Sequence, residues 1–221
     1  MSMRVRDVIF LPECPVCGNI ISGSVVCDRC EFSMENARLE KSVFTLGTEI
    51  GDVQVAGSFS YEFEPIRTLL FYFKRRINSD AARYAAMKML FDVRKLDICG
   101  SVLFVNVPRS SKNRRKYGYD QSALIARRIS GLYGGDSKFR SAIKRLPFSR
   151  EQKALSGKDR KSNVRNRFFV SPFSRLFLKE PENVVIVDDV LTTGSSIAES
   201  ARVLRNAFPN AKIFAAVFAV R

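Results

Sequence analysis

The chain has no histidine among its 221 residues. Imidazole is the most frequent general acid or base near neutral pH, and it completes Ser-His-Asp and Cys-His catalytic systems. Its absence excludes those mechanisms, together with every zinc site that needs an imidazole ligand. Long apolar runs are also missing. The longest, residues 213–220, has the length of a buried strand and is too short to cross a bilayer.

The N-terminal residues lack an extended apolar stretch and a small-residue cleavage site, so they do not resemble a signal peptide. From these absences we expect a soluble, cytoplasmic protein that does not insert into membranes. The length accommodates one ordinary domain and a small appendage. A content of 46% hydrophobic and 27% charged residues is typical of a folded chain, which argues against disorder.

Basic charge is concentrated in two stretches of a chain whose formal net charge is +15. Residues 109–116 carry five basic residues and no acid, and residues 138–167 carry eleven against two acids. Solubilising surfaces usually mix both signs, so this clustering favours a polyanionic partner, either a phosphate-rich small molecule or nucleic acid. We favour DNA for the second stretch, because eleven cations are more than one diphosphate can use.

Four cysteines near the N-terminus, Cys14, Cys17, Cys27 and Cys30, have the spacing C-x2-C-x9-C-x2-C. Two CxxC pairs can bring four thiolates to one tetrahedral zinc ion, and such a closed site is structural rather than catalytic. Two disulfides or a redox CxxC pair are the alternatives, and both fit poorly with a chain that looks cytosolic. The fifth cysteine, Cys99, is expected to be a small buried hydrophobe.

Hydrophobic periodicity predicts alternating strands and helices in the remaining chain. Residues 31–52 look like an irregular linker, and we divide the chain into a zinc-binding unit with its linker (1–40) and a main domain (41–221). Residues 146–167 are expected to be loop with short helix. The alternation favours an α/β fold with a mostly parallel sheet and helices on both faces. We expect strands at residues 53–61, 102–107, 184–187 and 213–220, and helices at residues 66–77, 82–93, 124–132 and 197–208.

Residues 183–196, NVVIVDDVLTTGSS, have the composition of a phosphate-binding site. An apolar strand is expected to end at two carboxylates, Asp188 and Asp189, followed by a turn and then a helix. Gly194 permits a tight turn, and N–H groups at the start of a helix attract anions. The candidate ligands of a sugar 5′-phosphate are Leu191, Thr192, Thr193, Gly194, Ser195 and Ser196.

The two carboxylates would repel a phosphate, so we expect their partners to be sugar hydroxyls or a metal ion. The phosphate-binding turn and the acid pair together suit a ribose 5-phosphate. The simpler alternative is an acidic turn followed by an N-capping threonine or serine. That alternative does not explain two carboxylates directly after a fully apolar strand.

The segment VVIVDDVLTTGSS (184–196) resembles the signature with which type I phosphoribosyltransferases bind 5-phosphoribosyl pyrophosphate (PRPP). Residues 107–129, VPRSSKNRRKYGYDQSALIARRI, are similar to a region of the ComF family, in which a strand and a basic loop lead into an R-G-F-N-Q-type motif. Here Tyr119 and Asp120 replace Phe and Asn of that motif. With the cysteines in front, the resemblance covers nearly the whole chain. A further similarity is the spaced set Gln152, Arg160, Asn163 and Phe168.

The resemblance implies a type I phosphoribosyltransferase-like domain that binds PRPP with Mg²⁺, behind a zinc ribbon. Asp188 and Asp189 would hold the ribose hydroxyls and are candidates for proton transfer. Any reaction would displace pyrophosphate at C1′ by a nitrogen nucleophile. The implied pyrophosphate-binding residues are Pro108, Arg109, Ser110 and Ser111, and the implied flexible loop includes Lys112, Arg114, Arg115, Lys116, Tyr117 and Tyr119.

The ComF family is associated with natural transformation and uptake of single-stranded DNA, so the resemblance implies single-stranded DNA and the uptake machinery as partners. Two other functions remain open: a non-catalytic module that binds single-stranded nucleic acid, and a phosphoribosyltransferase of nucleobase salvage. The acceptor of a transferred phosphoribosyl group is not indicated. Tyr117 and Tyr119 are equally suited to stacking on a base and to packing at the start of the following helix.

Overall fold

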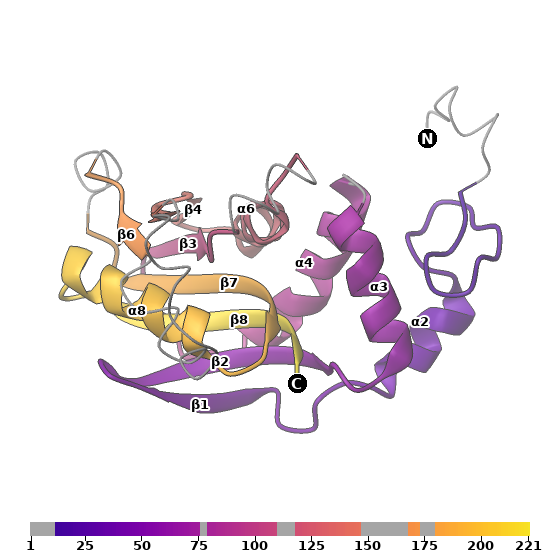
Figure 1. The fold of residues 1–221 in the computed structure, drawn as a ribbon, viewed down its shortest axis with the longest axis horizontal. Helices are drawn as coiled ribbons and strands as arrows, with labels where there is room; N and C mark the ends of the chain where they lie inside the picture. Colours follow the sequence, from indigo (N-terminus) through magenta and orange to yellow (C-terminus); the bar gives the residue numbers. More distant parts are fainter. Residues whose placement is uncertain (1–11, 76–78, 110–117, 147–167, 173–179) are drawn as a thin grey trace, which may run out of the picture.

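Six strands form the central sheet of the computed structural model, which describes residues 12–75, 79–109, 118–146, 168–172 and 180–221. The strand order is β1-β2-β8-β7-β3-β4 (Figure 1). The pairing of β1 with β2 is antiparallel and every other neighbouring pair is parallel. The strands are β1 (Val43–Thr48), β2 (Gly51–Ser60), β3 (Val102–Asn106), β4 (Ser137–Phe139), β7 (Asn183–Leu191) and β8 (Lys212–Val220).

Helices cover both faces of this sheet (Figure 1). Alternate residues of β7 enter the two apolar layers: Val185 packs in the layer that includes α3, α4 and α6, and Ile186 packs in the layer of α8. Strands buried on both faces are continuously apolar, as β3 and β8 are. The helices are α2 (Asp28–Glu35), α3 (Glu64–Arg75), α4 (Ser79–Val93), α6 (Gln121–Tyr133) and α8 (Ser195–Ala207).

The parallel neighbours β3 and β7 form a switch point, because the connections that follow them lead to opposite sides of the sheet. From β3 the chain passes through α6 to the outer strand β4, whereas from β7 it passes through α8 to β8 on the other side. Helices α6 and α8 lie on opposite faces. Such a switch point opens a crevice outside the carboxyl ends of the two strands, which is where α/β sheets bind ligands.

The predicted α/β fold with a mostly parallel sheet and flanking helices is confirmed, and its main strands and helices lie close to where periodicity placed them. The strand expected at 184–187 is longer than predicted. It runs through Asp188 and Asp189 to Leu191, because β8 pairs with it as far as Val220. Three short strands were not predicted: β4, β5 (Ile143–Arg145) and β6 (Phe168–Val170), the last two forming a separate antiparallel pair.

The irregular linker expected over residues 31–52 is wrong. Helix α2 continues to Glu35, and β1 forms a hairpin with β2 in which Val43 pairs with Ala56 and Thr48 with Gly51. The hairpin turn has only two residues between the strands, and Gly51 has φ of 101°, a conformation that favours glycine. The apolar alternation of strand β1 is short: Phe44 and Leu46 pack toward the layer of α8, while Thr45 and Gly47 are exposed.

The N-terminal unit packs against α3 and α4 at one end of the molecule (Figure 1). Lys88 of α4 contacts Glu31 and Glu35 of α2, with Nζ–O distances of 2.5 and 2.6 Å. Buried Met34 of α2 belongs to the same apolar layer as Met89 of α4. In the described part of the chain, no helix combines the length and the apolar character that a bilayer span requires.

Candidate functional site

The acid pair, Asp188 and Asp189, lies near the carboxyl end of β7 at the switch point. The Oδ1 atom of Asp188 accepts hydrogen bonds from the Ser122 hydroxyl and the Asp189 N–H, both at 2.9 Å. Asp189 extends toward α3, where its Oδ2 lies 3.5 Å from Lys74 Nζ. Burial and the neighbouring charge of Asp189 raise the pKa of Asp188 to about 8. The pair therefore retains a proton near neutral pH unless a ligand stabilises its ionised form.

The phosphate loop, residues 191–196, joins β7 to α8. Gly194 precedes α8 with φ of 74°, and a Cβ atom at this position would lie 2.8 Å from Cδ1 of Leu46 on β1. Glycine thus suits the backbone conformation, and a larger residue would also require the end of the Leu46 side chain to move. The N-cap residue, Gly194, has no side chain to accept from the first N–H groups of α8, and the Ser195 N–H reaches the Thr193 hydroxyl only at 3.5 Å. These donors and the positive end of the helix dipole suit an anion.

The hydroxyl groups of the phosphate loop lie at the surface. Thr192 and Thr193 are exposed and Ser195 is half-buried. The hydroxyls of Thr193 and Ser195 are 2.8 Å apart, so they bond to one another and face the same region. Ser196 is half-buried, and Leu191 is buried in the layer under α8. The structure therefore places the predicted phosphate-binding residues together at the start of α8.

The predicted pyrophosphate loop follows β3 beside the acid pair. The N–H of Val107 donates to the carbonyl of Val187 at 3.0 Å, so the segment after β3 stays beside β7 up to the crevice. Pro108 is buried, and Arg109 is half-buried. The remaining predicted loop residues, Ser110, Ser111, Lys112, Arg114, Arg115, Lys116 and Tyr117, lie outside the described residues, as do Gln152, Arg160 and Asn163.

Asp120 connects the pyrophosphate loop to α6. Its Oδ2 accepts hydrogen bonds from the Arg109 N–H at 3.1 Å and from Asn106 Nδ2 at 3.3 Å, and its Oδ1 accepts from the Ala123 N–H at 3.2 Å. Asp120 is thus the N-cap of α6 and also an anchor for the chain that leaves β3. Burial raises the pKa of this carboxyl.

Tyr119 packs between two structural elements. Its hydroxyl donates a hydrogen bond to the carbonyl of Phe73 in the last turn of α3, and the Arg109 guanidinium lies 5.8 Å from its ring centre. Of the two roles considered for this residue, the structure supports packing near the start of α6. The contact also holds the end of α3 beside the crevice.

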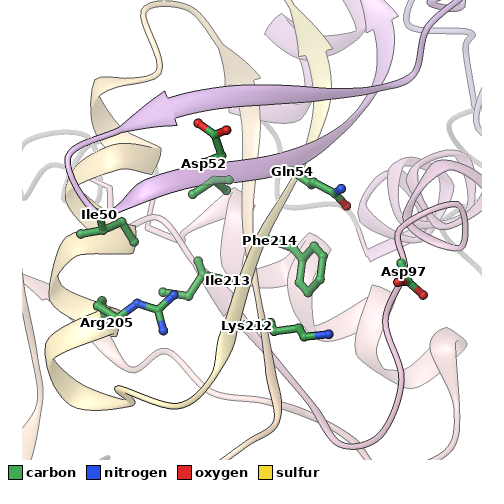
Figure 2. Close-up of a pocket in the computed structure, with 9 residues that line it drawn as sticks. Ile50, Asp52, Gln54, Asp97, Arg205, Lys212, Ile213 and Phe214 are labelled. Atoms are coloured by element: carbon green, nitrogen blue, oxygen red, sulfur yellow. The ribbon is translucent and has the colours of Figure 1, made fainter.

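A hollow of about 290 Å³ lies at the amino ends of β2 and β8, far from the acid pair. Figure 2 shows Arg205 and Ile213 on one side of β8, and Phe214 and Lys212 on the other, so the side chains do not converge. One nitrogen of Arg205, NH1, donates to the carbonyls of Pro209 and Ala211, each at 2.8 Å. We therefore place the candidate site at the crevice between β3 and β7.

The four N-terminal cysteines form one cluster, with all Sγ atoms within 4.8 Å of one another. The Sγ atoms of Cys17 and Cys27 are 3.7 Å apart, far beyond a disulfide bond of about 2.05 Å but close to the spacing of about 3.8 Å expected for tetrahedral Zn–S bonds of about 2.3 Å. The cluster suggests structural zinc binding. Cys99 is exposed, so the expectation that it is buried is wrong: it lies after α4 in a stretch of irregular chain.

Protonation of the cluster differs from one thiol to the next. Burial opposes ionisation of Cys14, but the Cys27 N–H and other backbone donors outweigh it and lower the pKa of this thiol to about 7. Burial and the neighbouring sulfur atoms raise the pKa of the Cys30 thiol. A dication would remove this conflict, because coordinating thiols are deprotonated. The residues present therefore fit a zinc ion.

No family model matches the chain. It is 31% identical over 101 residues to Competence protein F of Haemophilus influenzae, which covers 46% of this chain and 43% of that protein. It is 32% identical over 142 residues to the DNA utilization protein YhgH of Escherichia coli K12, covering 63% of this chain and 59% of that protein. The match to YhgH of Salmonella typhi has the same extent and 31% identity. The chain thus spans about half the length of these relatives.

These matches support assignment of the chain to the ComF family. Three crevice residues were not identified from the sequence, although each contacts a predicted one: Lys74, Asp120 and Ser122. Asp120 was noticed only as a departure from the ComF motif, and its position four residues before the apolar stripe that begins at Leu124 was an available N-cap signal. Lys74 and Ser122 have no local signal, because only the tertiary fold brings them to β7.

Proposed function

We propose that the chain binds PRPP in the crevice at the carboxyl ends of β3 and β7. The observation that carries the proposal is the arrangement of β7: an acid pair and a helix N-terminus whose N-cap is glycine follow one another at a topological switch point. The 5′-phosphate would lie against the phosphate loop, and the ribose hydroxyls would donate to Asp188 and Asp189. The diphosphate would lie by Pro108, Arg109 and, we propose, Ser110 and Ser111.

The residues of the crevice also fit Mg²⁺, because carboxylates and diphosphate oxygens are the ligands this ion prefers. Asp188 and Asp189 are the residues that would hold it, and when bound it neutralises charge on the diphosphate. The chain itself would orient the ribose through the acid pair and stabilise the departing diphosphate with Arg109. In the reaction, a nitrogen nucleophile forms a bond to C1′ while the bond from C1′ to the diphosphate oxygen breaks.

We further propose that the protein acts in competence and DNA utilization, with single-stranded DNA and the uptake machinery as partners. The relatives carry names of these processes, and a net charge of +15 suits a polyanion. In this proposal residues 1–40 form a structural zinc-binding unit, and residues 41–221 form the PRPP-binding domain. Contacts to a DNA backbone would make binding weaken steeply as salt concentration rises.

Calorimetric titration of PRPP with Mg²⁺ into the zinc-loaded protein tests the site. Saturable binding is expected in the wild type and should be lost in the double variant Asp188→Ala, Asp189→Ala. A second double variant, Asp52→Ala, Asp97→Ala, also removes two aspartates but at the far end of the sheet, and should bind like the wild type. Absence of PRPP binding to the folded wild type would refute the proposal.

A strain that carries the acid-pair variant separates this function from a module that only binds nucleic acid. If PRPP binding matters, transformation should fall while purified variant and wild type bind single-stranded DNA equally. Unchanged transformation would make a requirement for the PRPP site untenable and would favour the non-catalytic alternative.

A further inference from the structure

Lys74 contributes a cation to the crevice from an element that lies far away in the sequence. Its Nζ is 3.5 Å from Oδ2 of Asp189, more than a hundred residues along the chain. The last turn of α3 is held in this position by the hydrogen bond from Tyr119 to the Phe73 carbonyl. The Lys74 side chain is 36% exposed and that of Asp189 is 16% exposed, so solvent reaches the pair.

The contact between Lys74 and Asp189 is a weak one. Strong charge-assisted hydrogen bonds between ammonium and carboxylate groups are about 2.7–2.9 Å long, and this pair is clearly longer. Ion pairs that solvent reaches contribute little to stability, since water screens both charges. The lysine can therefore leave Asp189 for a better partner at small cost.

Lys74 also lies on the side of the sheet where the diphosphate is expected. Helix α3 packs in the same apolar layer as α6, whereas the phosphate loop leads into α8 on the opposite face. Tyr119 links the end of α3 to Arg109 of the pyrophosphate loop. A lysine ammonium binds phosphate oxygens as a mobile point charge on a flexible stem, which suits exchange between two anions.

We propose that Lys74 is a PRPP-binding residue that exchanges partners. In the empty site it pairs with Asp189; in the complex it contacts the diphosphate and leaves the Asp189 oxygen to a ribose hydroxyl. This inference rests on the proposed PRPP function and adds a diphosphate contact from outside the recognised motifs. A lysine that only held Asp189 in place would affect every ligand of the acid pair alike, whereas a diphosphate contact distinguishes ligands with and without that group.

The test compares two ligands in two neighbouring variants. Dissociation constants of PRPP with Mg²⁺ and of ribose 5-phosphate are measured by calorimetry for wild type, Lys74→Met and Arg75→Met. Arg75 is the matched control, because it is one residue further along α3 and its guanidinium lies 5.8 Å from the Phe71 ring. Lys74→Met should weaken PRPP binding on the order of tenfold and leave ribose 5-phosphate binding within about twofold. Arg75→Met should change neither.

The possible outcomes separate this inference from the function on which it rests. If the wild type does not bind PRPP, the proposed function itself fails. If the wild type binds but Lys74→Met behaves like Arg75→Met, or weakens both ligands equally, the exchange is refuted and the PRPP site stands. Circular dichroism and thermal melting verify the fold of each variant; should Lys74→Met not fold, Lys74→Gln carries the same comparison.

Discussion

The cysteine cluster and the crevice are both candidate binding sites, but they are built in different ways. All four thiols come from residues 14–30, so their spacing in the sequence already determines the site. The crevice combines residues from α3, β3, α6 and β7, and Lys74 is more than a hundred residues from the acid pair. A local site should lose its ligand when one coordinating residue is removed, whereas a site assembled from distant elements should lose affinity gradually as single residues are removed.

Removal of one thiol should have the largest effect. In Cys30→Ser, zinc content should fall to near zero, because three thiolates do not close the tetrahedral site, and the melting temperature should drop since buried Cys30 and Met34 belong to the main apolar layer. Metal analysis and thermal melting check both. Cys99→Ser is the control, as this exposed cysteine lies outside the cluster and should behave like wild type. Full zinc retention in Cys30→Ser would contradict the four-cysteine site.

Gly194→Ala should be the next most severe change. The new Cβ would lie 2.8 Å from Leu46 Cδ1, and the positive φ strains any other residue, so we expect a loss of about 1–3 kcal/mol in the free energy of unfolding. Denaturant titration measures it. The double variant Gly194→Ala, Leu46→Ala removes the clash and should recover part of the loss relative to Leu46→Ala alone. A loss that is the same in both backgrounds would show that Leu46 does not cause it.

Asp120→Ala should have a smaller effect that divides the capping role from the charge. The alanine variant loses the N-cap of α6 and the bond to the Arg109 N–H, and should be destabilised by about 1 kcal/mol. Asp120→Asn keeps one acceptor oxygen for the cap but loses the acceptor of the Arg109 N–H, so it should be destabilised less than Asp120→Ala. Equal destabilisation of both variants in denaturant titrations would mean that the negative charge, rather than the acceptor geometry, is required.

The same contrast explains which parts of the structure the sequence predicts. Continuous apolar runs identify β3, β7 and β8, because strands buried on both faces are apolar by necessity. Alternation of apolar and polar residues identifies β2. Strand β1 was missed because its order comes from pairing with β2. Motif chemistry identifies the acid pair and Gly194, because these residues lie within one short segment of the sequence. Lys74 and Ser122 were missed because a charged or hydroxyl side chain on a helix gives no sign of the distant strand that it will contact.

The fourth effect we expect is a dependence of stability on pH that arises from the acid pair. Burial raises the pKa of Asp188 from 3.8 to about 8, so the folded ligand-free protein keeps a proton that the unfolded chain has lost. The contribution of this proton to stability is complete below about pH 4 and declines as the pH rises toward about 8.

Asp188→Asn cannot ionise and keeps an oxygen for the Ser122 hydroxyl. The variant should therefore match wild type near pH 4 and exceed its melting temperature increasingly up to about pH 8, with a level difference above. Asp136→Asn is the control and should show no such trend, because this exposed acid lies at the amino end of β4, at the other end of the sheet from Asp188. A melting-temperature difference for Asp188→Asn that is constant with pH would contradict the raised pKa, and would mean that the crevice, like the cysteine cluster, owes its stability to bonding geometry rather than to its charges.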